Sequence, residues 1–173
     1  MNASATLDQP HAGLLGWLAS HGVEHEIHEH AATFTARSAA RAEGIDPQTF
    51  GKVVVVVTND DRRVLLVLDA TDHVDLRKAR EALDAKEVRL LTEAELKALT
   101  PDCEVGATPA VGELFGLPML ADRAVREDPA ISFNAGSHRF SVRVDRAEWE
   151  RATGVRYADL AAESDARPAW ARS

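Results

Sequence analysis

The segment "FGKVVVVVTNDDRRVLLVLDA", residues 50–70, decides the fold. Its five consecutive valines, residues 53–57, are typical of a strand that is buried on both faces. The polar residues 58–63 predict a turn, and "VLLVLDA", residues 64–70, predicts a second strand that pairs back onto the first. Lys52 immediately precedes the valines, so its ammonium group either reaches solvent or lies at the edge of a pocket.

The segments on either side alternate between helical and strand patterns. Helices are predicted from Pro10 to Gly22 and over residues 35–44, 75–83, 92–99 and 145–154, and strands over 23–30, 87–91 and the hairpin 130–144. Capping residues support four of these helices. The expected N-caps are Thr35, Asp75, Thr92 and Asp145. The expected fold class is α+β: a compact, curved, mixed and mostly antiparallel β-sheet flanked by helices. The expected division is a flexible N-terminus over residues 1–9, a domain over 10–162 and a C-terminal tail over 163–173.

Composition narrows the class of protein. The chain has 173 residues, of which 45% are hydrophobic and 28% charged, an ordinary globular balance. Cys103 is the single cysteine, which excludes an internal disulfide and suits a reducing cytoplasm. We find no signal peptide and no apolar run near the ~20 residues of a membrane span, so a cytoplasmic location is expected.

The charge bears on nucleic-acid binding. A net charge of −8 argues against a general nucleic-acid coat, because phosphate binding needs a basic surface. A local basic rim remains open if the fold gathers Arg37, Arg41, Arg62, Arg63, Arg139 and Arg143.

Two other patterns suggest chemistry but lack the required spacing. On a strand, His28 and His30 share one face while His25 faces the other way, so the three cannot surround one metal and a solvated strand face is expected. A triad of Ser137, His138 and Asp122 is disfavoured, because adjacent strand residues point to opposite faces. Cys103 is expected to be a small buried residue rather than a nucleophile.

Two loops are better candidates for a site. In "GATPAVG", residues 106–112, and "NAGS", residues 134–137, backbone amides can converge on an anion or a polarised carbonyl. Either loop alone is typical of a turn. Together with Lys52 at the start of a buried strand they predict a pocket into which the ammonium group reaches.

These segments resemble the YbaK/EbsC superfamily of aminoacyl-tRNA deacylases, which is related to the editing domain of bacterial prolyl-tRNA synthetases. The likeness covers roughly residues 10–160. It rests on "FGKVVVV" from residue 50, "DHVDLRKAREAL" at 72–83, "CEVGATPAVGELFGLPMLAD" at 103–122 and "ISFNAGSHRFSVRV" at 131–144.

The resemblance implies an enzyme that hydrolyses the ester between a wrong amino acid and the 3′ end of tRNA, using a bound water and neither metal nor cofactor. It implies catalytic roles for Lys52, Gly106, Ala107 and Thr108, and substrate-binding roles for Pro109, Asn134, Gly136, Ser137 and His138. The implied partners are mischarged tRNA and an aminoacyl-tRNA synthetase, with no membrane. A pocket of valines and a tight loop suits a small amino acid such as alanine.

The sequence departs from the family pattern at two positions. Ala110 stands where the family loop carries proline, and Val53 where several members carry threonine. Two other functions stay open: a non-catalytic tRNA- or synthetase-binding regulatory module of the same fold, which the acidic net charge favours, and a hydrolase of small molecules unrelated to tRNA.

Overall fold

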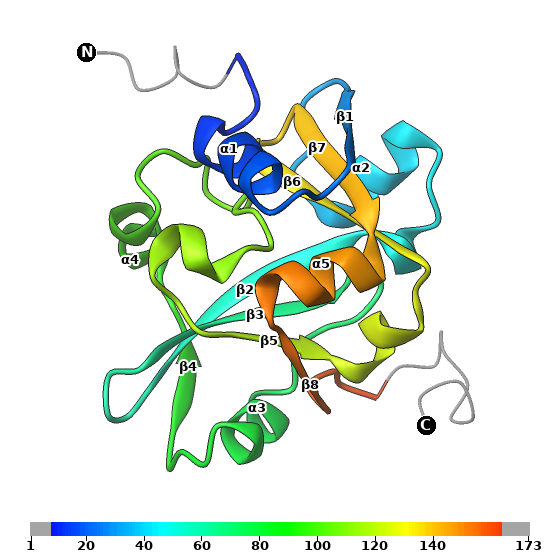
Figure 1. Ribbon diagram of the computed structural model, residues 1–173. Helices are drawn as coiled ribbons and strands as arrows, with labels where there is room; N and C mark the ends of the chain where they lie inside the picture. The colour runs from blue at the N-terminus through cyan, green and yellow to red at the C-terminus, as the bar shows by residue number, and fades with distance from the viewer. Residues whose placement is uncertain (1–7, 164–173) are drawn as a thin grey trace.

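The computed structural model describes residues 8–163, whose strands form two sheets (Figure 1). The three-stranded sheet has the order β1 (His25–Glu29), β7 (Phe140–Asp145), β6 (Ala130–Ser137). The five-stranded sheet has the order β4 (Val88–Leu90), β2 (Gly51–Thr58), β3 (Arg63–Asp69), β5 (Met119–Asp122), β8 (Arg156–Ala158). Only the β3–β5 and β5–β8 pairs are parallel among these strands, so the predicted α+β class with mostly antiparallel strands is confirmed.

The strands do not form one continuous sheet. An isolated parallel bridge joins Phe50, just before β2, to Ser132 of β6 and so links the two sheets. The main core lies between the two sheets, where Val55 and Leu65 of one face Phe133 and Val142 of the other. Splitting the strands in this way lets one face of each sheet be buried against the other.

Helices close the ends of this core and cover the outer face of the larger sheet. They are α1 (Ala12–Ser20), α2 (Ala36–Glu43), α3 (Leu76–Ala82), α4 (Glu93–Leu99) and α5 (Arg146–Thr153), with short 3-10 turns at Pro47–Thr49, Gly112–Phe115 and Arg123–Glu127. Leu14 of α1 and Trp149 of α5 are fully buried in the main core. Ala79 of α3 packs with Val56 and Leu66 on the opposite face, so the valine strand is covered on both sides.

The capping residues predicted from the sequence do begin their helices. Thr35 and Thr92 form capping boxes, and the side chains of Asp75 and Asp145 accept backbone hydrogen bonds from the first turns of α3 and α5. The prediction for the first helix was wrong at its start. It begins at Ala12 rather than Pro10, because Nδ1 of His11 accepts a hydrogen bond from Leu14 N at 3.0 Å and makes His11 the N-cap.

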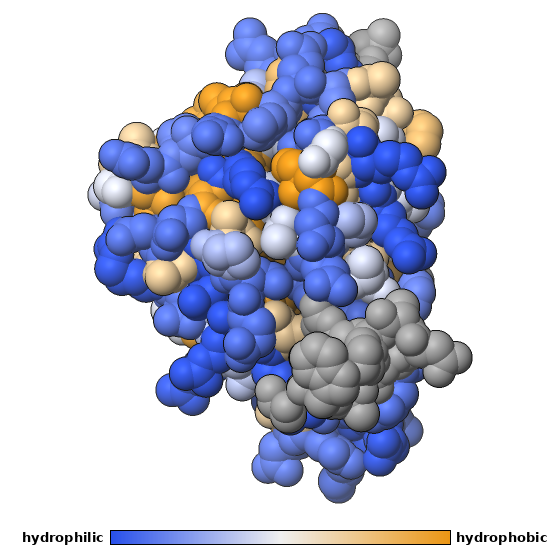
Figure 2. Space-filling model, turned by 90° about the vertical axis from the view of Figure 1, so that its right-hand side faces the viewer, coloured by the Kyte–Doolittle hydropathy of each residue, from blue (hydrophilic) through white to orange (hydrophobic). Residues whose placement is uncertain are grey.

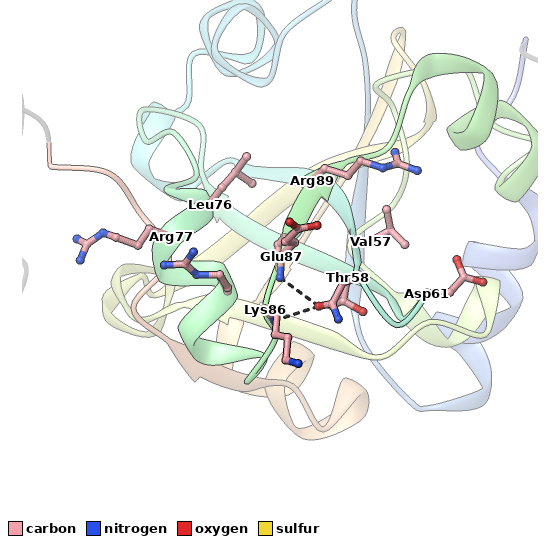
Figure 3. A pocket seen from close by; sticks show the side chains of 11 residues that line it. Val57, Thr58, Asp61, Leu76, Arg77, Lys86, Glu87 and Arg89 are labelled. Atoms are coloured by element: carbon pink, nitrogen blue, oxygen red, sulfur yellow. Dashed lines mark hydrogen bonds between the residues drawn. The ribbon is translucent and has the colours of Figure 1, made fainter.

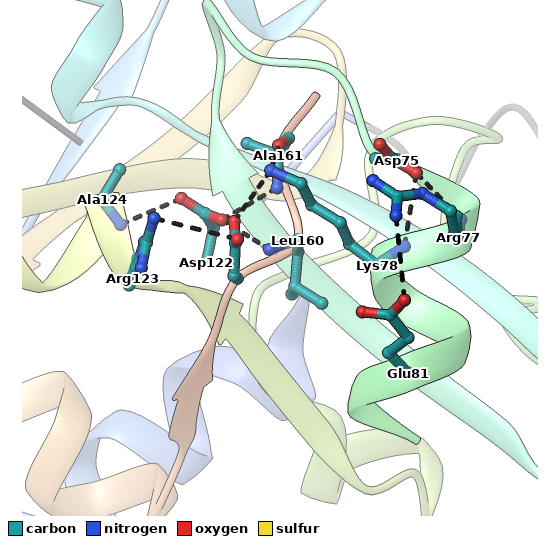
Figure 4. Close-up of polar contacts among 10 residues, drawn as sticks. Asp75, Arg77, Lys78, Glu81, Asp122, Arg123, Ala124, Leu160 and Ala161 are labelled. Carbon is teal, nitrogen blue, oxygen red and sulfur yellow. Dashed lines mark hydrogen bonds and ion pairs between the residues drawn. The ribbon is translucent and has the colours of Figure 1, made fainter. Parts of the chain in front are cut away.

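A buried carboxylate fixes the last strand (Figure 4). Asp122 Oδ1 accepts hydrogen bonds from the backbone N–H groups of Leu160 and Ala161 at 2.8 and 2.9 Å, and its Oδ2 accepts one from Ala124 at 2.9 Å. This contact, here called the Asp122 clasp, holds the chain after β8 beneath α3. The sequence analysis did not predict β8, a strand of three residues that pairs along one side only.

The surface is mostly hydrophilic on the side that Figure 2 shows, with apolar side chains confined to small areas. In the part of the chain that the structure describes, no helix is long and apolar enough to cross a membrane. The predicted flexible segment 1–9 and tail 163–173 lie almost wholly outside the described residues.

Candidate active site

A cavity of about 490 Å³ opens where β2 begins, at the seam between the two sheets. Its walls come from six separate parts of the chain: the start of α2, the start of β2, the segment before α3, β4, the loop at 106–108, and β6 at residue 134. The lining residues are Phe34, Thr35, Ala36, Gly51, Lys52, Val53, Val54, His73, Val74, Leu90, Gly106, Thr108 and Asn134. Lys52, Gly106, Thr108 and Asn134 are therefore brought together from segments far apart in the sequence.

Lys52 is held at the cavity wall. Its Nζ donates a hydrogen bond to the backbone oxygen of Asp72, and its side chain is partly buried. Burial lowers the pKa of Lys52 from its ordinary value; the Asp72 carboxylate opposes this shift and the Arg37 guanidinium adds to it. One bond to a carbonyl leaves two of the three ammonium hydrogens for another acceptor.

The valines next to Lys52 are less covered than the rest of the strand. Val55, Val56 and Val57 are buried, whereas Val53 and Val54 are only partly so, because they line the cavity. The prediction of a strand buried on both faces is thus confirmed for its second half. The first half faces the space beside Lys52.

Two polar atoms in the cavity wall have no partner. Thr108 and Asn134 are 4% and 8% exposed, yet Thr108 Oγ1 and Asn134 Oδ1 form no hydrogen bond with the described residues. Leaving a polar atom buried and unpaired costs roughly 1–3 kcal/mol. Unpaired atoms that line a cavity are available to a ligand that could satisfy them.

Backbone geometry presents these atoms to the cavity. Gly106 has φ +87°, a left-handed conformation that favours glycine, and a Cβ there would lie 3.4 Å from His138 Cε1. The two loops bind each other, since Gly136 N donates to Ala107 O at 2.9 Å and Glu104 N donates to Gly136 O at 2.8 Å. A register shift between Asn134 and Ser137 interrupts the pairing of β6 with β7, and such bulges commonly re-aim side chains beside functional sites.

The other residues named from the sequence lie behind the cavity wall. Ala107 and Pro109 are buried in the loop and do not line the cavity. Ser137 is fully buried, and its Oγ accepts a hydrogen bond from Arg139 N at 3.1 Å. His138 forms a hydrogen bond through Nε2 with Val105 O at 2.8 Å. Together with Gly136, these residues support the loop rather than face the space beside Lys52.

Apolar side chains gather around the opening. Among the described residues, the exposed large hydrophobic side chains are Ile27, Phe34, Leu76, Leu90 and Val105. Phe34 and Leu90 line the cavity and Val105 precedes Gly106. Phe34 is 79% exposed and its ring centroid lies 5.4 Å from that of His138. Exposed apolar surface beside unpaired polar atoms is typical of a binding site.

Sequence reasoning missed several lining residues. Phe34 and Thr35 stand just before a helix, and His73 and Val74 stand before another, where no periodic pattern marks them. The one available signal was the "DHVD" segment at 72–75, which the resemblance covered without assigning a role.

The groups considered as nucleophiles are engaged elsewhere. Burial raises the pKa of Cys103 to about 12, with the nearby Asp102 carboxylate adding to the shift, so the thiol stays protonated at neutral pH. Asp122 belongs to the clasp, and Ser137 is buried and hydrogen-bonded. None of these residues lines the cavity.

His28 of β1 and His30, which follows that strand, lie close to the buried carboxylate of Glu43. His30 Nε2 lies 3.1 Å from Glu43 Oε2, and His28 Nδ1 lies 4.0 Å from Glu43 Oε1. The side chains of Glu43 and His30 are 2% and 5% exposed, so the expected solvated face was wrong for His30, which α2 covers. Ser141 Oγ also donates to Glu43 Oε2, at 2.5 Å.

One other group of side chains has the chemistry of a metal site. Among the described residues it consists of His11, Asp102 and Cys103, whose ligand atoms lie within 4.8 Å of one another. His11 Nδ1 accepts from Leu14 N, so in the neutral ring Nε2 carries the hydrogen and donates it to Asp102 Oδ2 at 2.7 Å. A metal on Nε2 would require loss of that proton, so the arrangement does not fit a ligand set. That no metal is required stays a prediction.

Comparison with known proteins supplies the family. The model of the aminoacyl-tRNA editing domain matches residues 30–152, a range that contains Lys52, Gly106, Thr108 and Asn134. The chain belongs to the aminoacyl-tRNA editing domain family. The resemblance inferred from the sequence motifs is thereby confirmed, and no curated protein matches the chain.

Solved structures agree with this assignment of the editing domain. A candidate trans-editing enzyme for prolyl tRNA synthetase superposes with a TM-score of 0.77 at 27% identity, covering 87% of this chain and 96% of that one. A hypothetical protein superposes with a TM-score of 0.77 at 21% identity, covering 87% of this chain and 99% of that one. A structure from work on grafting epitopes onto scaffold proteins superposes with a TM-score of 0.77 at 24% identity, covering 88% of this chain and 96% of that one. The last two are similar in fold alone.

Proposed function

We propose that this editing domain is a trans-acting deacylase that hydrolyses the ester of mischarged aminoacyl-tRNA, with a small amino acid such as alanine as the preferred substrate. The observation that carries the proposal is the trio of Lys52 Nζ, Thr108 Oγ1 and Asn134 Oδ1 in one cavity wall, with the two oxygens buried and unpaired. The substrate offers complementary groups: an α-ammonium for the oxygens, and ester, ribose and phosphate oxygens for the lysine.

The chemistry needs no protein nucleophile. Water attacks the ester carbonyl carbon, and the bond from that carbon to the ribose oxygen breaks. One proton of the water passes to the ribose oxygen and the other to solvent, and the amino acid leaves as a carboxylate. An aminoacyl ester is already activated, so positioning water and stabilising the oxyanion suffice. Lys52 would stabilise negative charge, and Gly106 would let the loop backbone approach the ester closely.

Selection of the amino acid would rest on the cavity walls. Val53, Val54, Val74 and Leu90 make the wall beside Lys52 apolar. One methylene group contributes only ~1–3 kcal/mol to binding, so a preference for a small amino acid would require these walls to exclude larger side chains. The site is expected to act in the cytoplasm, on tRNA released from a synthetase.

A panel of mischarged tRNAs incubated with the pure protein tests this proposal. Release of one small amino acid, faster than the uncatalysed rate and abolished by Lys52→Ala, is the expected result. Binding of tRNA without hydrolysis of any ester would instead identify a non-catalytic module. Hydrolysis of simple esters in preference to aminoacyl-tRNA would identify a small-molecule hydrolase.

A further inference from the structure

A second cavity, of about 650 Å³, lies between α3 and β4 (Figure 3). It continues from the active-site cavity along neighbouring residues of the same strands. On β2, Val54 lines the first cavity and Thr58 the second; on β4, Leu90 lines the first and Val88 the second. Val54 and Thr58 share the face of β2 that carries Lys52, because side chains alternate along a strand. The two cavities therefore follow one face of the sheet.

The charge of this second cavity, here called the α3–β4 groove, is opposite to that of the whole chain. Its charged lining residues are Arg77, Arg80, Lys86, Arg89, Asp61 and Glu87. Four are cationic and two anionic, which gives a net +2 in a chain that carries −8. Figure 3 shows Arg77 on the helix and Lys86 and Arg89 along the β4 side.

Some of these charges are already paired. Asp61 lies 3.3 Å from Arg63, and Arg89 binds both carboxylate oxygens of Glu95 at 2.7 and 3.0 Å. Within residues 8–163, the side chains of Arg80 and Lys86 form no ion pair, and both are exposed. An anionic partner can therefore bind Arg80 and Lys86 without first displacing a carboxylate from either side chain.

The arginines expected from the sequence to form a basic rim are not gathered in this way. Arg37 lies close enough to Lys52 to lower its pKa. Arg62 and Arg63 line a different cavity, and Arg139 pairs with Asp8 and Glu29. The basic surface next to the active site comes instead from α3 and the residues around β4.

We propose that the α3–β4 groove binds the backbone phosphates of the acceptor end of the tRNA whose 3′ terminus enters the active-site cavity. This inference rests on the proposed function. From Lys52 to Thr58, β2 advances by about 20 Å at ~3.3 Å per residue. Successive nucleotides of one stacked strand advance by ~3.4 Å along the helix axis, so a path of this length matches about six nucleotides. That length covers the single-stranded 3′ end and the first paired bases.

Charge reversal tests the groove with a matched control. Arg80→Glu and Lys86→Glu are each compared with Arg156→Glu, which changes an exposed arginine in the cavity that Arg62 lines. Two substrates are used: alanyl-tRNA, and 3′-alanyl-adenosine, which is too short to reach the groove. We expect each groove variant to lower kcat/KM at least ~10-fold on alanyl-tRNA only, and to reduce the slope of log affinity against log salt by about one unit.

Direct binding of uncharged tRNA separates this inference from the proposed function. If the wild type hydrolyses no ester but binds tRNA, and Arg80→Glu weakens that binding, the groove is supported and the enzyme is rejected. Equal loss on both substrates, or a loss no larger than that of Arg156→Glu, would overturn the groove. So would competition by polyglutamate as strong as that by tRNA, because the surface would then be a site for acidic protein.

Discussion

The Asp122 clasp and the wall of the active-site cavity are both buried and polar, but they use hydrogen bonds differently. Asp122 is 2% exposed and accepts three backbone hydrogen bonds. Thr108 and Asn134 are nearly as buried, and their side-chain oxygens are unpaired. Hydrogen bonds offset the cost of burial in the clasp only. The clasp therefore stabilises the fold, whereas the cavity wall keeps hydrogen-bonding capacity for a ligand.

The largest expected effect is at Lys52. Lys52→Ala should lower deacylation at least ~100-fold, the scale of one well-placed electrostatic group, with a melting temperature close to that of the wild type. Lys52→Arg should lose a similar amount, because the planar guanidinium cannot replace the compact ammonium in the same space. Thermal melts and single-turnover assays on the same preparations measure both quantities. Full activity in Lys52→Ala would reject the mechanism.

A substitution in the Asp122 clasp should lower stability and leave activity almost unchanged. Asp122→Asn replaces a charged acceptor of backbone N–H groups, and we expect the free energy of unfolding to fall by about 2–3 kcal/mol. Below the melting transition, kcat/KM should stay within about twofold of the wild type. Urea titration measures the unfolding free energy and deacylation assays measure kcat/KM. A large loss of kcat/KM in folded Asp122→Asn protein would contradict the separation of the clasp from the cavity wall.

The pH dependence of deacylation should follow the titration of Lys52 in the cavity wall and should not depend on the Asp122 clasp. In the proposed mechanism the ammonium form of Lys52 is the active one, so activity should be present below the pKa of Lys52 and lost as the pH rises through it. Because burial lowers that pKa, the midpoint of the loss should lie below pH 10.5, the ordinary value. Rates are measured after subtraction of spontaneous ester hydrolysis, with Asp122→Asn expected to give the same profile as the wild type. Activity that keeps rising beyond pH 10.5 would contradict the role of the ammonium.

The smallest effect is expected at Cys103, which lies near the loop but not in the cavity. Its pKa of about 12 keeps the thiol protonated at neutral pH. Cys103→Ser should retain activity within about twofold, and iodoacetamide should leave the wild type active. Loss of turnover in a folded Cys103→Ser protein would show that the thiol takes part in catalysis.

Local signals in the sequence predicted much of this fold. The five valines and the turn after them predicted β2 and β3, and the side chains of Thr35, Asp75, Thr92 and Asp145 mark the starts of four helices. The separation into two sheets was not predicted, because it depends on contacts between distant segments such as the bridge from Phe50 to Ser132. Short parallel strands such as β8 carry too few residues for a pattern.

The candidate site was predictable where a residue has an unusual local context. Lys52 stands before a valine run, and Gly106 adopts a conformation that favours glycine. Phe34 and His73 reach the cavity only through the tertiary arrangement of α2 and α3. The α3–β4 groove was missed for a related reason: Arg80 and Lys86 alternate with acidic residues along the chain, and only folding places them beside the cavity.

Thr108→Val tests the central claim, that the unpaired atoms of the cavity serve a ligand. The control is Thr100→Val, because Thr100 is 1% exposed and its Oγ1 donates to Leu96 O at 2.9 Å. Urea unfolding and deacylation of alanyl-tRNA are measured for both. For Thr108→Val we expect an unfolding free energy equal to the wild type or up to about 1 kcal/mol higher, with kcat/KM ~10-fold lower. For Thr100→Val we expect a loss of about 1 kcal/mol and full activity. A Thr108→Val protein that is as destabilised as Thr100→Val and fully active would contradict the account.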